Sequence, residues 1–383
     1  MLYFDYAASA PPYEDVIRTV SEVMKLHYGN ASSIHAYGEN AGRLLNKSRS
    51  VCAEALDVKP DEVIFTSGAT ESNNLAIKGT ALRYQSRGRH IITTRTEHAS
   101  VYESIKFLSE IGYDITYVPV DEMGRVKTED VLDAVTKETI LVSLMHVNNE
   151  TGAVHPVVEI GQALKQKHPK IVFHVDGVQA YGKIPVQLAE SGIDLYSISG
   201  HKIRGPKGVG LLYIRSGLEL TPLMSGGSQE QGMRAGTENI PLIVGMSKAM
   251  RLARERQPEL NTHLKKLQIL LLEEIRLHPE WVLNSSEEGT PHIVHFSYPG
   301  MKAEVMLHVL EQLNVIVSTQ SACSSKQAIP SRVLLGMGKS EAIADSGIRV
   351  SLGDQHTEQD ILQLIQAMRQ MKERLASFEG WNR

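Results

Sequence analysis

Short apolar runs alternate with amphipathic stretches from about residue 60 to about residue 215. Near-continuous apolar runs of four to nine residues are typical of strands buried on both faces of a parallel sheet, and amphipathic stretches between them are typical of covering helices. The pattern therefore predicts a large α/β domain with a mostly parallel, seven-stranded sheet. The predicted strands are residues 62–66, 90–94, 113–120, 139–147, 171–176, 195–199 and 208–214.

The pattern changes after the last of these strands. Residues 216–240 lack periodicity and contain SGG and QGMRAGTEN, which indicates a functional loop. Apolar positions at three- and four-residue spacing then predict a long helix over 241–277 that bridges two domains. The remaining pattern predicts a small α+β unit, with strands at 292–298, 314–319 and 348–353 and helices at 303–313 and 357–376. We expect the first fifty or so residues to pack with this unit or with a partner subunit.

A chain of 383 residues exceeds the size at which a single core stops growing, so more than one domain is expected. We divide it into an N-terminal arm on the small-domain side (1–15), a large domain (16–255) and a small C-terminal domain (256–383). The small domain would carry Cys323 on a loop.

Composition excludes several functions. The net charge is −4 without a basic block, which argues against direct nucleic-acid binding. The N-terminus lacks the features of a signal peptide and no stretch is long enough to cross a bilayer, so we expect a cytoplasmic protein without a membrane partner. Cys52 and Cys323 are the two cysteines, and their wide separation suggests neither a disulfide framework nor a metal site.

Two charged residues end neighbouring predicted strands. Asp176 ends the strand 171–176, and Lys202 follows the strand 195–199. A carboxylate against a pyridinium nitrogen and a lysine that forms a Schiff base are the two groups that a pyridoxal phosphate (PLP) enzyme needs. Taken singly, the aspartate is equally explained as a cap or turn residue and the lysine as a solvated charge.

Other polar residues also follow strands. Residues 67–70 lie where a helix should begin, so their backbone N–H groups could bind an anion, although an ordinary helix cap explains them too. His98 could stack on a flat cofactor or be an ordinary hydrogen-bonded histidine. Asn148 and Gln179 complete the set. Because ligands of open α/β sheets bind at the carboxyl ends of strands, these residues predict one site together with Asp176.

Two further residues suit chemistry in the small domain. Cys323 is flanked by Ala322 and Ser324 rather than by large apolar residues, which favours a nucleophile on a loop over a buried thiol. Cys52, in a helical pattern, fits the buried alternative. Arg349 lies on a short apolar run, where its guanidinium could bind a substrate carboxylate or form a salt bridge.

The chain resembles the PLP-dependent cysteine desulfurases of aminotransferase class V, within fold type I, and it is most similar to their IscS/NifS-like branch. The resemblance covers essentially the whole chain and rests on motifs in the order of the family. These motifs are YFDYAASAPP, NASSIHAYG, FTSGATESNN, TEHAS, NNETG, HVDGVQ, SGHKIRGPKG, MRAGTEN, SACSS and RVSLG.

The resemblance implies a role for each candidate residue. Lys202 would hold pyridoxal 5'-phosphate as a Schiff base, Asp176 would pair with its pyridine nitrogen, and His98 would stack on its ring and take part in catalysis. The remaining cofactor contacts would come from Asn148 and Gln179 near the phenolic oxygen and, at the phosphate, from Ala69, Thr70, Ser199, His201 and the partner subunit's Thr237. A homodimer would therefore complete each site. Arg349 would bind the carboxylate of L-cysteine, with Asn30 and His35 nearby.

The implied reaction converts L-cysteine to L-alanine and leaves the sulfur on Cys323 as a persulfide. An acceptor protein would then receive the sulfur for iron–sulfur clusters, tRNA thiolation or thio-cofactors. One alternative is a selenocysteine lyase or another PLP-dependent β-lyase. A second alternative, of a different class, is a sulfur-relay scaffold protein, although that reading predicts loss of Lys202 or Cys323 and both are present.

Overall fold

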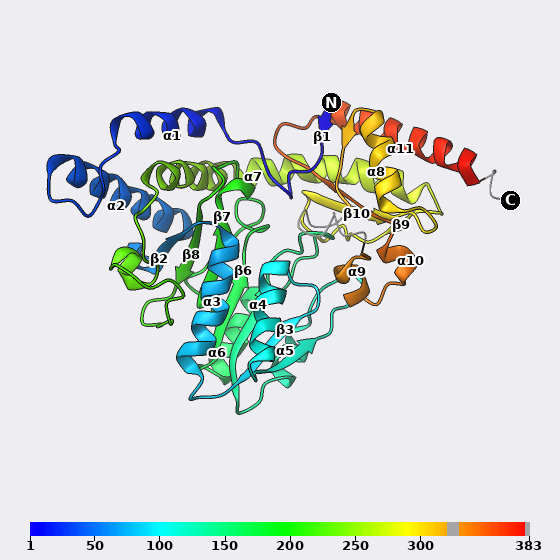
Figure 1. Cartoon of the computed structure of the whole chain (residues 1–383). Helices are drawn as coiled ribbons and strands as arrows, with labels where there is room; N and C mark the ends of the chain where they lie inside the picture. Colours follow the sequence, from blue (N-terminus) through cyan, green and yellow to red (C-terminus); the bar gives the residue numbers. More distant parts are fainter. Residues whose placement is uncertain (320–328, 380–383) are drawn as a thin grey trace.

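The computed structural model describes residues 1–319 and 329–379. A large α/β unit and a smaller α+β unit lie side by side, and the helix α7 (Ile240–Arg276) runs along both of them (Figure 1). The first half of α7 packs in the core of the large unit and its second half in the core of the small unit. The predicted bridging helix is confirmed.

The large unit is built on a seven-stranded sheet of order β2-β8-β7-β6-β5-β3-β4. Neighbouring strands are parallel except at β8, which is antiparallel to both β2 and β7. All seven predicted strands are confirmed. Their bounds are β2 (Val63–Thr66), β3 (His90–Thr94), β4 (Asp114–Val118), β5 (Thr139–Met145), β6 (Val172–Asp176), β7 (Leu195–Ser199) and β8 (Gly210–Ile214).

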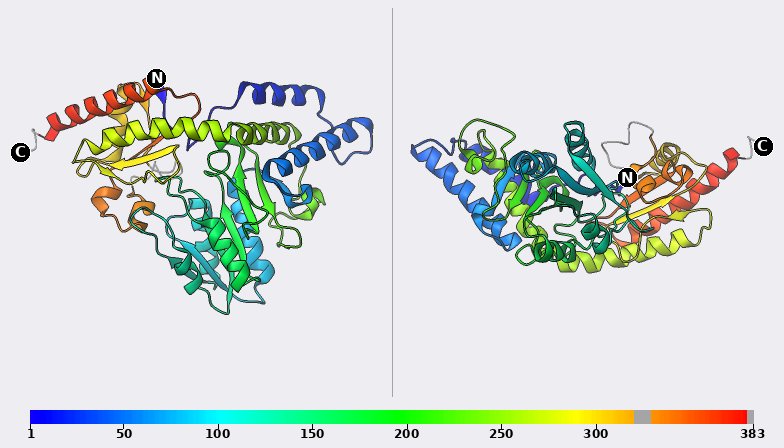
Figure 2. Two further views of the ribbon diagram at one scale, coloured as in Figure 1. Left: turned by 180° about the vertical axis from the view of Figure 1, so that it is seen from behind. Right: turned by 90° about the horizontal axis from the view of Figure 1, so that it is seen from below.

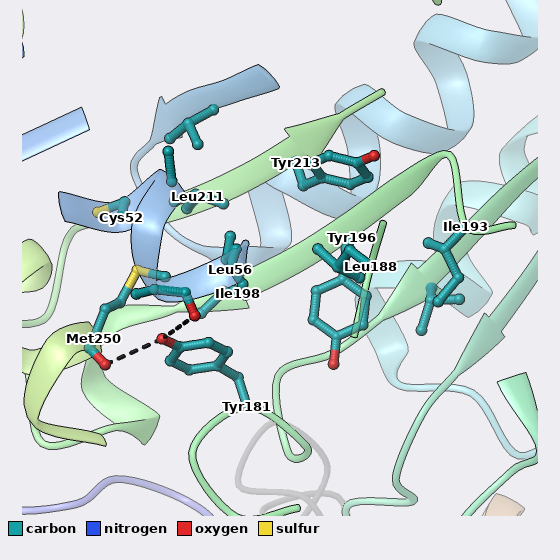
Figure 3. Packing of buried hydrophobic residues seen from close by; sticks show 14 of the residues in the cluster. Cys52, Leu56, Tyr181, Leu188, Ile193, Tyr196, Ile198, Leu211, Tyr213 and Met250 are labelled. Carbon is teal, nitrogen blue, oxygen red and sulfur yellow. Dashed lines mark hydrogen bonds between the residues drawn. The ribbon is translucent and has the colours of Figure 1, made fainter. Parts of the chain in front are cut away.

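Consecutive residues of these strands pack into different cores on the two faces of the sheet. Ile91, Leu141 and Leu195 face α3 (Ala69–Tyr84) and α4 (Ala99–Glu110). The residues that follow them, Ile92, Val142 and Tyr196, belong to the opposite core, which contains α6 (Val157–Lys167) and the first half of α7. This burial on both faces explains why the strands read as continuous apolar runs. Figure 3 shows part of the second core around Tyr196 and Tyr181, whose hydroxyl donates to the carbonyl of Met250 at 3.1 Å.

Two N-terminal helices, α1 (Glu14–Leu26) and α2 (Ala36–Leu56), pack against the first half of α7 at the end of the molecule remote from the small unit (Figure 2). Of the two expected positions for the first fifty residues, packing with the small unit is therefore wrong for these helices, and packing with a partner subunit stays a prediction. Their apolar faces bury Val16, Val23 and Leu45 in the large core. Cys52 is fully buried there, and burial raises the pKa of its thiol. The prediction that Cys52 is a buried cysteine is confirmed.

The small unit has an antiparallel sheet of order β12-β10-β9 and a parallel pair formed by β1 and β11. Its core joins these strands to the second half of α7. Because the core changes along α7 between Ala253 and Leu264, we propose to keep the domain division at residues 255/256. Its elements are β1 (Leu2–Tyr3), β9 (Val282–Leu283), β10 (Ile293–Ser297), α8 (Ala303–Gln312), β11 (Val315–Ile316), α9 (Arg332–Gly336), α10 (Glu341–Ala344), β12 (Gly347–Ser351) and α11 (Glu358–Glu379).

Short elements complete the described chain: α5 (Thr128–Asp133) and the 3-10 helices η1 (Pro60–Glu62), η2 (Gly200–Lys202) and η3 (Gln229–Gly232). Over residues 1–319 and 329–379, none of the helices combines the length and the apolar character needed to span a membrane.

Candidate functional site

A cavity of about 530 Å³ lies at the carboxyl ends of β5, β6 and β7, where the large unit meets β12 of the small unit. This is the position at which open α/β sheets bind ligands. Most of the predicted site residues line it. They are Ala69, Thr70, His98, Asp176, Gln179, Ser199, His201, Lys202 and Arg349.

Asp176, the last residue of β6, provides a buried carboxylate in the cavity. Its Oδ2 accepts a hydrogen bond from Nδ2 of Asn73 at 2.8 Å, and its Oδ1 accepts one from the backbone N–H of Val178 at 3.1 Å. Burial raises the pKa of Asp176, against the opposing effect of these hydrogen bonds and of Lys202. A buried carboxylate gains strongly from a cationic partner, so a protonated ring nitrogen is a suitable ligand for this position.

Lys202 ends the short helix η2, which directly follows β7. Its Nζ donates to the backbone carbonyls of Ala7 and Ala8, at 2.5 and 2.8 Å. The N-terminal segment thus forms one wall of the cavity, with Ala7, Ala8 and Ser9 in the lining. Sequence reasoning missed this wall, because no local pattern shows that backbone carbonyls will be presented to a side chain nearly two hundred residues away.

The arm also connects the two units. The backbone N–H of Ala7 donates to Oγ of Ser351 in β12 at 2.9 Å, and its carbonyl accepts from Nε2 of Gln179 at 2.9 Å. Farther along, the N–H of Ala10 donates to the carbonyl of His201 at 3.0 Å. The small unit and Lys202 are therefore held through one short stretch of backbone.

One end of the cavity is suited to an anion. Ser67, Gly68, Ala69 and Thr70 line it where α3 begins, so the positive end of a 16-residue helix faces the cavity. Ser199, His201 and Lys207 lie in the same lining. Burial, with Lys202 and Lys207 nearby, lowers the pKa of His201 to about 4, so its ring is neutral and acts as a hydrogen-bonding group.

His98 immediately precedes α4 and caps it. Its Nδ1 accepts a hydrogen bond from the backbone N–H of Ser100 at 3.2 Å and lies 2.8 Å from Oγ of Ser100. Burial and the positive charges of Lys202 and Arg332 lower the pKa of His98 to about 4. Asn73 also contacts Oγ of Ser100, at 2.9 Å, so the cavity has a polar layer that sequence reasoning did not identify. Asn73 lies in the motif FTSGATESNN, but nothing in that motif distinguishes it from the neighbouring Asn74.

Arg349 lies on β12 with only 1% of its surface exposed. Its Nη1 donates to the carbonyl of Asn149 and its Nη2 to Oδ1 of Asp5, both at 2.8 Å. Its buried Nε has no hydrogen-bond partner within the described residues. A buried guanidinium with an unused donor at a cavity wall is well suited to a ligand carboxylate.

The prediction for Asn148 needs a correction. Asn148 is absent from the cavity lining because its side chain holds the turn after β5: its Nδ2 donates to the carbonyl of Thr96, and its Oδ1 accepts from the N–H groups of Glu150 and Thr151. The next residue, Asn149, lines the cavity, and its buried Oδ1 has no partner among the described residues. Adjacent residues in a turn point in different directions, and the sequence NN does not show which one faces the ligand.

Three predicted residues lie outside this chain's cavity lining. Asn30 and His35 are exposed between α1 and α2, and Thr237 is exposed between η3 and α7. Within one chain Asn30 and His35 do not lie near Arg349, because α1 and α2 pack on the large unit, away from the small unit (Figure 1). Their place beside a bound substrate stays a prediction. His35 instead caps α2 by accepting a hydrogen bond from the N–H of Gly38.

Cys323 lies in residues 320–328, outside the described residues. The described residues on either side of this segment contact Arg349, which lines the cavity, and Glu150, which follows the lining residue Asn149. Ser318 pairs with Arg349 through the backbone, with the N–H of Arg349 donating to the carbonyl of Ser318 at 2.7 Å. Oγ of Ser331 donates to Oε2 of Glu150 at 2.6 Å.

The residues present fit pyridoxal phosphate. Asp176 suits the ring nitrogen, Lys202 suits the aldehyde carbon, and the N-terminus of α3 suits the phosphate. The unpaired Oδ1 of Asn149 and Nε of Arg349 are further groups that a ligand could pair with. Within residues 1–319 and 329–379, no three His, Cys, Asp or Glu side chains cluster as a metal site.

Comparisons with known proteins agree with this chemistry. The family profile described as aminotransferase class V matches residues 2–364. The chain is 40% identical to a protein of Dictyoglomus turgidum named cysteine desulfurase IscS, over 99% of this chain and 96% of the relative. Among solved structures it is similar to a NifS-like protein, with a TM-score of 0.91, 36% identity and coverage of 98% and 99% of the two chains. It is also similar to a structure titled SspA in complex with cysteine, with a TM-score of 0.81, 35% identity and coverage of 92% and 99%.

Proposed function

The chain belongs to the aminotransferase class V family, and from this membership we propose that it is a PLP-dependent cysteine desulfurase that converts L-cysteine to L-alanine. The observation that carries the proposal is that Asp176, Lys202 and Arg349 line the same cavity. A lysine, a buried carboxylate and a carboxylate-binding arginine around one volume are the requirements of amino-acid chemistry on this cofactor.

The proposed binding of the cofactor follows from the geometry of the cavity. When bound, pyridoxal phosphate supplies an electron sink for the carbon atoms of an amino acid. Asp176 would hold the ring nitrogen, Lys202 would hold the cofactor covalently through Nζ, and His98 would lie against the ring. Gln179 and, in place of Asn148, Asn149 would serve the phenolic oxygen. The proposed phosphate contacts are Ala69, Thr70, Ser199 and His201.

The substrate would be oriented from the small unit. Arg349 would bind the carboxylate of L-cysteine, because its side chain is already fixed by Asp5 and by the carbonyl of Asn149. With the substrate bound, Nζ of Lys202 would be the base within the same cavity that takes the proton from the α-carbon. Arg349 and Lys202 would thus divide the work: Arg349 binds the substrate carboxylate and Lys202 transfers the proton.

Cys323 would take the sulfur. Its thiolate forms an S–S bond with the substrate sulfur while the C–S bond breaks, and the electron pair of that bond stays with the carbon that becomes the methyl group of alanine. Support comes from two contacts of the flanking residues: Ser318 pairs with Arg349, which lines the cavity, and Ser331 donates to Glu150, the residue after the lining residue Asn149. The persulfide would then pass its outer sulfur to an acceptor protein for iron–sulfur clusters, tRNA thiolation or thio-cofactors.

We also propose that a homodimer forms the complete site. Thr237, Asn30 and His35 are exposed on this chain, so they could reach a cofactor or substrate only in the cavity of a second copy. Large apolar side chains are exposed beside them, with Tyr28 71% and Ile34 97% exposed. Such a concentration of exposed apolar residues is typical of a protein interface.

The test is a product assay. Purified holoenzyme would be incubated with L-cysteine and a thiol reductant, and alanine and sulfide would be quantified for the wild type, Cys323→Ser and Lys202→Ala. We expect equimolar products from the wild type, little from Cys323→Ser, and no covalently bound cofactor in Lys202→Ala. A cofactor-loaded wild type that makes no alanine would contradict the choice of cysteine, and selenocysteine and other β-substituted amino acids would then be compared. Sulfide formation and transfer at the wild-type rate by Cys323→Ser would contradict the role of Cys323.

A further inference from the structure

We propose that Asn73 and Ser100 hold His98 as a neutral ring with its proton on Nε2, so that His98 meets cofactor and substrate as a hydrogen-bond donor. The inference rests on the proposed function for its ligand, but the hydrogen-bond directions that carry it come from this chain alone. Asn73 and Ser100 would be positioning residues that act through His98.

Asp176 determines the orientation of the Asn73 amide. Nδ2 of Asn73 lies 2.8 Å from Oδ2 of Asp176 and 2.9 Å from Oγ of Ser100, and all three residues are buried. An ionised carboxylate only accepts hydrogen bonds, so the amide must turn its NH₂ group toward Asp176. Both amide hydrogens are then used, one by the carboxylate and one by Oγ of Ser100.

The direction of the next hydrogen bond follows. Because Oγ of Ser100 accepts from Asn73, its own hydrogen is available for Nδ1 of His98, 2.8 Å away. The backbone N–H of Ser100 donates to the same nitrogen at 3.2 Å. Two donors therefore point at Nδ1, which must be the unprotonated nitrogen. A neutral imidazole then carries its hydrogen on Nε2, the nitrogen left for a ligand in the cavity.

The surrounding charges also oppose a second proton on the ring. Lys202, Arg332 and Arg349 are the cations that act on His98, and the ring caps the positive end of α4. The preceding Glu97 offers little compensation, because burial raises the pKa of its carboxyl to about 8 and keeps it mostly protonated near neutral pH. The carboxylate of Asp176 does not stabilise a charged His98 ring directly, because it accepts its hydrogen bonds from Asn73 and from the backbone N–H of Val178.

The tautomer divides the work between His98 and Lys202. A resting His98 with a proton on Nε2 cannot take a proton from the substrate at that nitrogen. Removal of the α-proton is thereby left to Lys202, while His98 orients and donates. A histidine whose Nδ1 lost these donors would exchange tautomers and gain protons more easily, so both proton transfer and its pH dependence would change.

The experiment measures the tautomer directly. Holoenzyme labelled with ¹⁵N-histidine would be studied by long-range ¹H–¹⁵N correlation between about pH 5 and pH 8, with His98 assigned by its absence in His98→Gln. The variants are Ser100→Ala, the conservative Ser100→Thr, and Ser104→Ala as a matched control. Ser104 is buried on the same helix, and its hydroxyl donates to the carbonyl of Ser100 rather than to His98.

We expect wild type, Ser100→Thr and Ser104→Ala to show only the neutral Nε2–H form, and Ser100→Ala to show a tautomer mixture whose titration moves toward neutral pH. Loss of this positioning should lower kcat roughly tenfold while KM changes less than about twofold. A wild-type ring protonated on Nδ1, or a Ser100→Ala ring and pH profile identical to wild type, would overturn the inference. If the wild type shows the expected tautomer yet makes no alanine from cysteine, the inference stands and the proposed function fails.

Discussion

Arg349 Nη2 lies 2.8 Å from Asp5 Oδ1, so the proposed carboxylate-binding residue is held by the N-terminal arm rather than by its own unit alone. Arg349 is almost completely buried, and a lysine cannot reproduce its two fixed contacts. We predict that Arg349→Lys raises KM for L-cysteine about tenfold or more with a smaller change in kcat, because a hydrogen bond to a charged group contributes about 1.5–3 kcal/mol. Steady-state kinetics of cofactor-loaded enzyme provide the measurement.

The matched control is Asp5→Asn, which keeps the acceptor Oδ1 and removes only the charge. Its KM should stay within about threefold of wild type if position, rather than charge, is what Asp5 contributes. An unchanged KM in Arg349→Lys would contradict the proposed role of the guanidinium.

The chain offers a direct comparison of two buried aspartates. Asp176 faces the cavity, whereas Asp194 lies away from it and accepts hydrogen bonds from Lys165 and from the N–H of Phe173. We predict that Asp176→Asn weakens cofactor binding about 10- to 100-fold, since a charged hydrogen bond is lost. Asp194→Asn should lower the free energy of unfolding while the folded protein keeps its cofactor. Cofactor retention after desalting, followed by absorbance, separates the two, and equal retention would contradict the role of Asp176.

The two cysteines should differ in reactivity. Cys52 has no exposed surface, and burial raises the pKa of its thiol. In Cys323→Ser under native conditions, we therefore predict that a thiol reagent labels almost nothing until denaturant is added. Cys52→Ala should keep desulfurase activity and lose about 1 kcal/mol of stability, because it leaves a small cavity in the core. Fast labelling of native Cys323→Ser would show that the core around α2 opens readily.

Stability should fall as the pH falls from about 6.5 to about 5. Burial lowers the pKa of His146, His174 and His295 to about 3 and that of His155 to about 4. The unfolded chain takes up protons on these residues near its ordinary histidine pKa and the native chain does not, so each contributes up to about 1.4 kcal/mol per pH unit of lost stability in this range. Glu97, with its pKa raised to about 8, and Asp176, with its pKa also raised, have the opposite sign. They are outnumbered by these four histidines together with His98 and His201, whose pKa values are lowered to about 4.

Urea unfolding at several pH values provides the measurement for this prediction. His174→Gln can keep contacts with Ser143 and Ser197 and should reduce the slope of stability against pH by about one proton. His308→Gln, at an exposed position of α8, is the control. A wild-type stability that rises toward pH 5 would mean that carboxyl groups outweigh the buried histidines.

The fold and much of the site could be predicted because both depend on local signals. Each strand is buried on both faces, so its apolar run is visible without any partner, and the rule that ligands bind at strand ends then brings Asp176, His98 and Lys202 together. The hydrogen bonds between Asn73, Ser100 and His98 could not be predicted in this way. They depend on the rotamers of side chains from α3, from α4 and from the residue that caps α4.

Three errors have a common physical origin. The sequence predicts Asn148 rather than Asn149 at the ligand, because periodicity does not determine the direction of a side chain in a turn. The packing of α1 and α2 on α7 was missed because an amphipathic helix shows that it has an apolar face but not which surface covers it. The wall formed by Ala7 and Ala8 uses backbone carbonyls, which leave no trace in side-chain composition.

A last prediction concerns the support of Gln179 from the small unit. Its Oε1 lies 3.3 Å from Nε2 of the buried His292, whose Nδ1 lies 2.6 Å from Oγ1 of Thr290. The amide of Gln179 donates to the carbonyl of Ala7, so its Oε1 must accept, and His292 is its donor. His292→Leu leaves that oxygen unpaired, which should lower the free energy of unfolding by about 1–3 kcal/mol and speed the release of cofactor.

His292→Gln can restore a donor at the same place and should recover most of the cofactor retention, while its exposed counterpart His308→Gln should change neither quantity. Urea unfolding and the rate of loss of cofactor absorbance after dilution provide the two measurements. Release of cofactor from His292→Leu at the wild-type rate would contradict the role of His292 in orienting Gln179. The contact between His292 and Gln179 would then stabilise the fold only, because a change in the position of the Gln179 amide must alter cofactor release if that amide binds the cofactor.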